Sequence, residues 1–334
     1  MKKLKVTYFQ RNPFPSGNFS IEFIFDDVRR RLAGKVEARV KILKYRSGGL
    51  FPRLYSSVEA AFFQNEINHV TGDTSFAGIF LGKKRTVQTI HDCGFLDNRG
   101  PLPRFVLWFF WLWLPLKRAR KVTTVSGFVK KHLLELVNVP PGKIAVVPNA
   151  IDGIYRPVPK VFDKKRPVIL QVGMAHNKNV LRLIEAIEGI PCHLSIVGRI
   201  SGEVAEKLER HRIDFSNCFD ITQAEMFQKY AECDLLAFVS THEGFGMPII
   251  EANAVERAVV AGNVTAVPEV AADAACLVDP FSVESIRAGI LKTINDDAYR
   301  ERLIENGRKN RQRFDPQAVA EGYFRVYQEV LGQV

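Results

Sequence analysis

The chain has 334 residues, a length that suits two domains, each with a full hydrophobic core. Its hydrophobic content of 46% and charged content of 25% are ordinary for a soluble globular protein. The five cysteines are scattered and form no CxxC pair, so neither a disulfide framework nor a zinc site is indicated, and a reducing cytosol is expected. The N-terminus lacks the pattern of a secretory signal, and no apolar stretch reaches the roughly 20 residues of a membrane-spanning helix.

The formal net charge of +11 is unevenly distributed along the chain. Residues 1 to 150 contain 25 Lys and Arg against 10 Asp and Glu, whereas residues 151 to 334 contain 22 against 26. The basic first half predicts attraction to an anionic partner such as nucleic acid, an acidic glycan or an anionic lipid. Solvated Lys and Arg on helix faces are an equal alternative. Nucleic acid is the least expected partner, because no recognised nucleic-acid-binding module occurs.

Strands and helices are expected to alternate through the first half of the chain. The strand-like segments are residues 4–9, 36–44, 67–70, 85–90, 121–125 and 144–147. The helix-like segments are residues 19–32, 58–64 and a helix that Ser126 caps and that runs to about Val137. This alternation predicts a parallel α/β sheet.

An aromatic tract interrupts this pattern at residues 104 to 121 (RFVLWFFWLWLPLKRARK), which contain all three tryptophans. The apolar run from 105 to 116 is too short to span a bilayer. A buried helix of the first domain is one interpretation. The other is a contact with anionic lipid, because the aromatic residues are followed directly by Lys117, Arg118, Arg120 and Lys121.

The alternation restarts after a segment at residues 152 to 166 that contains Pro157, Pro159, Lys164 and Lys165 and is expected to be a linker. Strands are expected at residues 168–172, 193–197, 234–239 and 258–261, and helices at 180–187, 203–211, 223–231, 285–294, 298–312 and 316–331. We therefore expect a domain at 1–152 and a domain at 160–315, with a C-terminal helix at about 316–334 that packs back on the first. Ligands of such sheets bind beyond the carboxyl ends of the strands.

A short buried strand is expected at Cys233–Ser240, and the segment 241 to 254 (THEGFGMPIIEANA) that follows it predicts a glycine turn and then a helix with Pro248 at its first position. Backbone N–H groups of such a turn and the positive end of the helix favour an anionic group. Glu243 and Glu251 are more suited to accept hydrogen bonds from hydroxyls. Two glutamates at this spacing are common by chance, but the string EGFGMPIIEA is more specific.

This string resembles the E-x7-E motif of retaining GT-B glycosyltransferases of family 4, also called group 1. The resemblance implies two doubly wound Rossmann-like domains that face each other across a cleft. It places Glu243 beside the donor sugar as a catalytic residue and Glu251 on the nucleotide ribose. The turn residues Gly244, Phe245, Gly246 and Met247 are expected to bind the donor as well.

Two further segments of the second half resemble donor-binding segments of the family. VGMAHNKNVLRLIEAI, residues 172 to 187, implies a tight turn at Gly173 and a contact of Lys178 with the diphosphate. Met174 and Asn177 stand where family members often have Arg, which leaves the second cation open between Arg199 and Arg11. The family's IVG segment corresponds to Ile196 to Gly198, and assigns Gly198, Arg199 and Ile200 to the base pocket.

In the first half, residues 68 to 92 look like one branch of the family, in which the His corresponding to His91 lies near donor sugar and acceptor. His91 is thus a candidate to orient or polarise a hydroxyl, with a structural histidine as the alternative. Gly17, in the loop Pro15–Asn18, matches a glycine that approaches the diphosphate.

The resemblance implies transfer of a hexose, of the mannose or glucose type, from a UDP-, GDP- or ADP-sugar to a hydroxyl of a glycan or lipid-linked acceptor, with retention of anomeric configuration. No metal or other cofactor is expected, and the setting would be cell-surface polysaccharide synthesis in the cytoplasm, at the inner face of the plasma membrane if residues 104–121 contact lipid. The alternatives are a catalytically weak nucleotide-sugar-binding partner subunit and a sugar-nucleotide epimerase.

Overall fold

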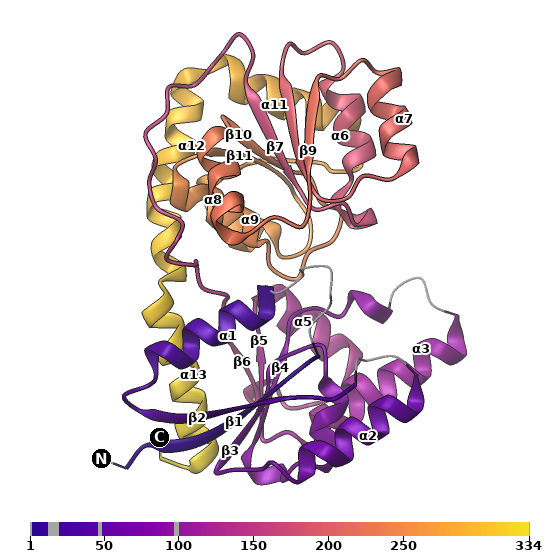
Figure 1. The fold of residues 1–334 in the computed structure, drawn as a ribbon, viewed down its shortest axis with the longest axis vertical. Helices are drawn as coiled ribbons and strands as arrows, with labels where there is room; N and C mark the ends of the chain where they lie inside the picture. Colours follow the sequence, from indigo (N-terminus) through magenta and orange to yellow (C-terminus); the bar gives the residue numbers. More distant parts are fainter. Residues whose placement is uncertain (1, 13–19, 46–48, 97–99, 334) are drawn as a thin grey trace. The chain divides into compact units, whose positions relative to one another are not determined.

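The computed structural model describes residues 2–12, 20–45, 49–96 and 100–333 of the chain. The chain divides into two compact units. The first comprises residues 1–150 and 316–334, and the second comprises residues 151–315. Each unit is a parallel α/β sheet with helices packed on it (Figure 1), as the alternation of elements predicted.

The first unit contains a six-stranded sheet in the order β2-β1-β3-β4-β5-β6. Its strands are β1 (Leu4–Gln10), β2 (Val36–Ile42), β3 (Ile67–Val70), β4 (Thr86–Ile90), β5 (Lys121–Thr124) and β6 (Ile144–Val146). The helices are α1 (Ser20–Arg31), α2 (Leu50–Ala61), α3 (Pro101–Leu107), α4 (Leu114–Arg118), α5 (Gly127–Leu136) and α13 (Pro316–Leu331). Short helical turns occur at η1 (Ser75–Phe80), η2 (Lys83–Arg85), η3 (Gly94–Leu96) and η5 (Pro141–Lys143), and η4 (Trp108–Trp113) is π-helical.

The C-terminal helix α13 completes the core of the first unit. Tyr323 and Tyr327 of α13 are fully buried in one apolar cluster with residues of β1, β3 and α1. Tyr327 Oη lies 2.7 Å from His69 Nδ1 on β3, and His69 Nε2 lies 2.7 Å from Thr89 Oγ1 on β4. These hydrogen bonds satisfy polar groups that burial would otherwise penalise, so they fix α13 across two strands.

The second unit contains a six-stranded sheet in the order β12-β11-β10-β7-β8-β9. Its strands are β7 (Val168–Val172), β8 (His193–Val197), β9 (Phe215–Cys218), β10 (Leu235–Phe238), β11 (Ala258–Gly262) and β12 (Cys276–Val278). The helices are α6 (Val180–Ile187), α7 (Gly202–Arg210), α8 (Gln223–Glu232), α9 (Met247–Val255), α10 (Val267–Ala271), α11 (Val283–Asn295) and α12 (Asp297–Asn310). Short helical turns are η6 (His176–Lys178), η7 (Ala272–Ala274) and η8 (Arg311–Phe314).

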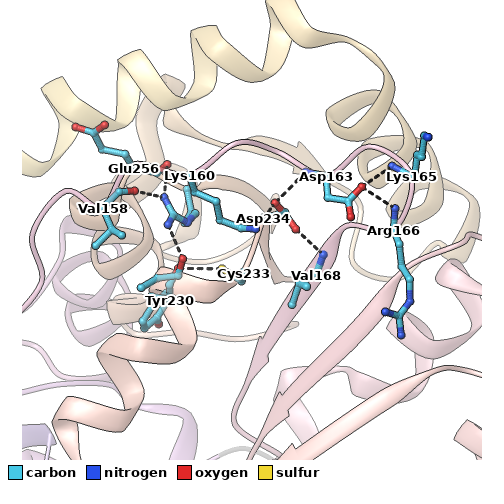
Figure 2. Close-up of polar contacts among 12 residues, drawn as sticks. Val158, Lys160, Asp163, Lys165, Arg166, Val168, Tyr230, Cys233, Asp234 and Glu256 are labelled. Atoms are coloured by element: carbon cyan, nitrogen blue, oxygen red, sulfur yellow. Dashed lines mark hydrogen bonds and ion pairs between the residues drawn. The ribbon is translucent and has the colours of Figure 1, made fainter.

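A buried carboxylate fastens the segment before β7 to the start of β10 (Figure 2). Asp234 accepts hydrogen bonds from the backbone N–H of Val168 at 2.8 Å and of Asp163 at 3.2 Å, and its Oδ1 lies 2.9 Å from Lys160 Nζ. Arg257 donates to the carbonyl of Val158 at 2.9 Å. The segment expected to be a linker is therefore held against the second sheet over residues 158 to 168.

The structure differs from the sequence expectations at a few elements. Helix α2 begins at Leu50, eight residues before the expected start, because Pro52 lies in the first turn, where a missing N–H costs little. Strands β9 and β12 were not expected, since each is short and lies at a sheet edge. The aromatic tract forms three consecutive helical segments, α3, η4 and α4, rather than one regular helix.

Candidate functional site

The strand order of the second sheet identifies where a ligand would bind. From β7, successive strands run outward to β8 and β9, whereas β10, β11 and β12 run outward on the other side. The order therefore reverses between β7 and β10, and ligands of doubly wound sheets bind at the carboxyl ends of the strands at such a switch point. Lys178 follows β7 and Glu243 follows β10.

Lys178 and Glu243 meet at this switch point. Lys178 Nζ lies 2.6 Å from Glu243 Oε1, and the two side chains are 19% and 14% exposed. The ammonium also lies 4.9 Å from the ring centroid of Phe238, at the end of β10. The stem of Lys178 passes so close to Gly173 that a Cβ there would lie 3.1 Å from Cε. This explains why a glycine is needed at position 173, because any side chain there would displace Lys178.

Two asparagines hold the loop that presents Lys178. Asn179 takes the left-handed conformation at φ 59°, and its buried amide donates to the carbonyls of Val239 at 3.0 Å and Pro280 at 2.6 Å. Asn177 donates to the carbonyl of His242 at 2.8 Å and accepts from the N–H of Thr241 at 2.8 Å. The loops after β7 and β10 are therefore joined directly, which fixes the ion pair from both sides.

The glycine turn starts helix α9 as predicted. Gly246 is the N-cap residue with φ +115°, a conformation that favours glycine, and Pro248 lies in the first turn. The backbone N–H of Glu243 donates to Thr265 Oγ1 at 3.0 Å. Glu243 thus lies only a few residues before the positive end of α9. A negatively charged group would be favoured at this helix end.

Glu251 lies one turn into α9 and is held by Tyr230 of α8. The Tyr230 hydroxyl donates to Glu251 Oε2 at 2.6 Å. Burial raises the pKa of Glu251 to about 7, although the Tyr230 hydroxyl and the charge of Lys178 act to lower that pKa. A carboxyl whose pKa lies so near neutrality, in the helix that follows the ligand-binding turn, is typical of a functional site.

The predicted base-pocket residues lie after β8. Gly198 has φ +137°, and a Cβ there would lie 2.6 Å from Cγ of Met174. Met174, which stands where an arginine is common in the family, therefore packs on Gly198. Arg199 lies 2.9 Å from Asp220 and stacks 4.1 Å from the ring centroid of Phe219. Ile200 packs against the apolar core of the second unit.

Two residues of the predicted donor-binding turn differ in their surroundings. Phe245 is buried and meets the ring of Phe314 edge-on at 5.5 Å, so its side chain packs within the second unit. Met247 is half-buried at the first residue of α9. The side chain of Phe245 therefore supports the turn, and the backbone of the turn is the part available to a ligand.

The first sheet has its own switch point, between β1 and β3, and an ion-pair network lies there. Arg11 follows β1 and is buried. Its guanidinium lies 2.8 Å from Glu22 and 2.5 Å from Asp73, which follows β3 with φ 54°. Sequence reasoning considered Arg11 as a diphosphate cation but missed both carboxylates. Asp73 lies in a Gly-Asp turn directly after a strand, which could have identified it.

His91 lies beside the same turn. Its Nε2 is 2.8 Å from the carbonyl oxygen of Thr71, which can only accept, so Nε2 bears the proton and Nδ1 is the acceptor in the neutral ring. A Cβ on Gly72, with φ +128°, would lie 2.4 Å from the His91 ring. The backbone after β3 therefore fixes both the tautomer and the orientation of His91.

The remaining predicted site residue, Gly17, lies outside the described residues, as does the loop around it. In the part of the chain that the structure describes, no three His, Cys, Asp or Glu side chains are grouped as ligands of one metal ion. None of the described helices is both long enough and apolar enough to cross a bilayer.

Two family models match the chain, one on each half. The model "Glycosyl transferases group 1" matches residues 157–310, and "Glycosyltransferase Family 4" matches residues 18–153. The chain belongs to the group 1, family 4 glycosyltransferases. The family assignment made from the sequence is thereby confirmed, and the two parallel six-stranded sheets agree with the GT-B class of fold.

Relatives of this glycosyltransferase include proteins with named activities. It is 28% identical over 222 residues to the O-antigen chain mannosyltransferase B of Escherichia coli, covering 60% of this chain and 58% of the relative. It is 25% identical to the serotype-specific mannosyltransferase WbdA of Escherichia coli, covering 64% of this chain and 30% of the relative. It is 30% identical to the D-inositol 3-phosphate glycosyltransferase of Segniliparus rotundus, covering 60% of this chain and 50% of the relative. The chain thus spans between about a third and three fifths of these relatives' lengths.

Solved structures share the fold over almost the whole chain. Anabaena HepE, in complex with UDP and glucose, aligns with a TM-score of 0.78 at 17% identity, covering 98% of this chain and 100% of that one. The sucrose-phosphate synthase of Thermosynechococcus elongatus aligns with a TM-score of 0.79 at 15% identity, covering 99% and 100%. At such identities these likenesses support the fold class.

Proposed function

We propose that this protein is a retaining glycosyltransferase that moves a hexose from a nucleoside diphosphate to a hydroxyl of a glycan or lipid-linked acceptor, in the synthesis of a cell-surface polysaccharide. The observation that supports this best is the Lys178–Glu243 pair at the switch point of the second sheet, beside the positive end of α9. Mannose is the first sugar to test, because two relatives are named mannosyltransferases. A nucleotide donor is in keeping with the structural neighbour HepE, which was solved in complex with UDP and glucose.

The proposed mechanism gives each charged group one task. Lys178 and the N–H groups at the start of α9 would stabilise the diphosphate as the bond to the sugar breaks, a task that needs no metal ion. Glu243 would exchange its bond with Lys178 for hydroxyls of the sugar, and Glu251 would accept hydrogen bonds from the ribose. His91 would present Nδ1 to a hydroxyl. The leaving phosphate would take the acceptor proton on the face from which it departs, which retains the anomeric configuration.

The first experiment identifies the donor. UDP-, GDP- and ADP-hexoses are tested for protection against thermal unfolding, because a ligand that binds the folded state raises the unfolding temperature. The protecting donor is then incubated with candidate glycan acceptors, and the anomeric configuration of the product is read by NMR. Lys178→Ala and Glu243→Ala should each lower transfer by about a hundredfold or more, because each removes a charge at the reacting centre.

Lys207→Ala is the matched control, since Lys207 forms an ion pair with Glu185 on the surface between α7 and α6. Its transfer rate should equal that of the wild type. Wild-type turnover in both Lys178→Ala and Glu243→Ala would refute the assignment. The same assay separates the alternatives: donor binding without any product indicates a partner subunit, and conversion of the donor sugar without an acceptor indicates an epimerase.

We also propose that the aromatic tract brings the protein to an anionic membrane surface, at the inner face of the plasma membrane. Its tryptophans point largely inward: Trp111 is buried, and Trp108 Nε1 donates to the carbonyl of Leu136 at 2.8 Å. Its exposed side is formed by Phe105, Val106 and Phe110, and Leu102 in the first turn of α3 is exposed as well. These side chains, next to Arg104, are suited to the boundary between lipid headgroups and acyl chains.

A further inference from the structure

Helix α2 exposes its large apolar side chains and buries its small ones. The residues that it buries are Ser56, Ser57 and Ala60. The exposed residues are Leu50 (71%), Phe51 (73%), Leu54 (53%), Tyr55 (39%) and Val58 (44%), followed by Phe62 (81%) just beyond the helix. A surface helix of a globular protein normally does the opposite, because apolar side chains are stabilised by removal from water. The pattern indicates that another apolar medium covers this face.

Specific contacts hold α2 in this orientation. Ser57 Oγ donates to the carbonyl of Phe76 in η1 at 2.9 Å. The Arg53 guanidinium lies 4.1 Å from the ring centroid of Trp111 in η4. On the next turn, Glu59 lies 2.8 Å from Lys41 of β2. The buried side of the helix is thus tied to three neighbouring elements, so rotation of the helix cannot hide its apolar face.

The contact between Arg53 and Trp111 also joins α2 to the aromatic tract. The exposed apolar side chains of that tract and of Leu102 just before it belong to α3 and η4. Helices α2 and α3 both belong to the first unit, and Figure 1 shows them on the same side of its sheet. The apolar surface therefore comes from two helices that are separated by about 40 residues of sequence.

Charge selects the occupant of this surface. Residues 43–62 and 100–121 contain eight Lys and Arg and a single acidic residue, Glu59, which is paired with Lys41. A second copy of the chain would bring like charges together, which opposes association. A bilayer with anionic headgroups offers an apolar interior and opposite charge at once. An anionic lipid surface therefore matches both the exposed apolar side chains and the positive charge, whereas a second copy of the chain matches only the first.

We propose that α2 and the exposed side of α3 and η4 form one lipid-binding surface, with α2 as its larger part. The apolar side chains of α2 would enter the outer part of the leaflet while Arg104 and Lys44 pair with anionic headgroups. This extends the membrane contact proposed above for residues 104–121 and rests on it, but it does not depend on the transfer reaction.

Flotation of the full chain with vesicles tests this proposal. The vesicles are phosphatidylcholine alone or phosphatidylcholine mixed with phosphatidylglycerol. We expect the wild type to float with the anionic vesicles. The double variant Phe51→Ser/Leu54→Ser should lose at least about tenfold in partitioning to the vesicles, because it removes apolar area that the bilayer would otherwise bury. Arg104→Glu should reduce the preference for anionic vesicles. Val161→Ser is the matched control, since Val161 is 91% exposed on the second unit, and it should float like the wild type.

Two outcomes would overturn the inference. One is equal flotation of the double variant and the wild type. The other is a wild-type dimer in sedimentation that the double variant converts to a monomer, which would make a second copy the occupant. Transfer to a detergent-dispersed acceptor is measured on the same variants. The double variant should keep wild-type transfer there, so loss of flotation with intact transfer separates failure of the membrane surface from failure of the proposed reaction.

Discussion

At the scale of single residues, opposite charges of the second unit lie together at the switch point, where the strand order of its sheet reverses between β7 and β10. Lys178 and Glu243 neutralise each other at 2.6 Å, while Glu251 lies nearby with its pKa raised to about 7. The ion pair keeps two charges from being left unpaired in a half-buried site, which would be costly. A donor would therefore have to replace the contact between Lys178 and Glu243, because neither charge is unpaired before the donor binds.

The raised pKa of Glu251 predicts a pH dependence of donor binding. The carboxylate accepts hydrogen bonds from hydroxyls better than the protonated acid, so the affinity for a nucleoside diphosphate should rise as the pH increases through about 7. Tyr230→Phe removes the hydroxyl that lowers this pKa, and should move the midpoint to higher pH. Isothermal titration of both proteins between pH 5.5 and 8.5 measures the shift. Ionisation of the diphosphate affects both proteins equally and cancels in the comparison.

Tyr299→Phe on α12 is the control for this shift, and its midpoint should match the wild type. The same pKa has a consequence for stability. Because the folded value of about 7 lies above the ordinary value of 4.5, the stability contributed by the protonated carboxyl is present below pH 4.5 and lost as the pH rises through 7. Identical midpoints in wild type and Tyr230→Phe would show that Glu251 does not control donor binding.

Lys178 and Glu243 were both predicted from the sequence as site residues, but the ion pair between them was not. Lys178 and Glu243 were each identified from a separate motif, 65 residues apart. The contact between them depends on β7 and β10 being neighbours in the sheet, which the strand order determines and a sequence pattern does not state. For the same reason Asp73 was missed, because its contact with Arg11 arises only when β1 and β3 lie side by side. Glu22 on α1, the other partner of Arg11, was missed as well.

At the scale of elements, periodicity predicted the strands and helices of the second unit closely. The segments 168–172, 180–187 and 193–197 match β7, α6 and β8 residue for residue. These elements are buried on one or more faces, so their apolar spacing is strong. The first unit departed most at α2 and the aromatic tract, where apolar residues face outward or form a π-helical segment. A pattern based on inward burial cannot predict elements whose large apolar side chains face outward.

The buried histidine that holds α13 predicts acid sensitivity of the first unit. Burial, with a smaller contribution from His91, lowers the pKa of His69 to about 3. In the unfolded chain the pKa would be 6.5, so only the unfolded state takes up the proton between these values. Stability from this group is present above pH 6.5 and is lost as the pH falls toward 3, by about 2 kcal/mol between pH 6.5 and 5.

Denaturation by urea at pH 7.5 and pH 5 measures this loss. His69→Gln removes the titrating group, so its stability should be lower at pH 7.5 but should change less between the two pH values. His176→Gln, at an exposed position of η6, serves as the control and should keep the wild-type pH dependence. If His69→Gln loses as much stability on acidification as the wild type, another group is responsible.

At the scale of the whole molecule, the chain enters the first unit, leaves it for the second, and returns to the first with α13. The return has an unequal effect on the two units. The six buried residues of α13 complete the apolar core of the first unit, whereas the core of the second consists of residues between 169 and 303. The second unit therefore contains its own core together with Lys178, Glu243 and Glu251.

This asymmetry predicts the result of ending the chain after Asp315. Without α13, the burial of Tyr323 and Tyr327 is lost, together with the hydrogen bond between Tyr327 and His69 on β3. Losses of a few kcal/mol for each large buried side chain together approach the stability of a typical domain. The first unit should unfold while the second stays folded and binds the nucleoside diphosphate. Hydrogen exchange followed by mass spectrometry should show protection lost in β1, β3 and β4 and kept in β7 and β10. A chain that ends after Leu331 is the control and should keep both. Protection of β1 and β3 in the shorter chain would mean that the first sheet is stable without its C-terminal helix.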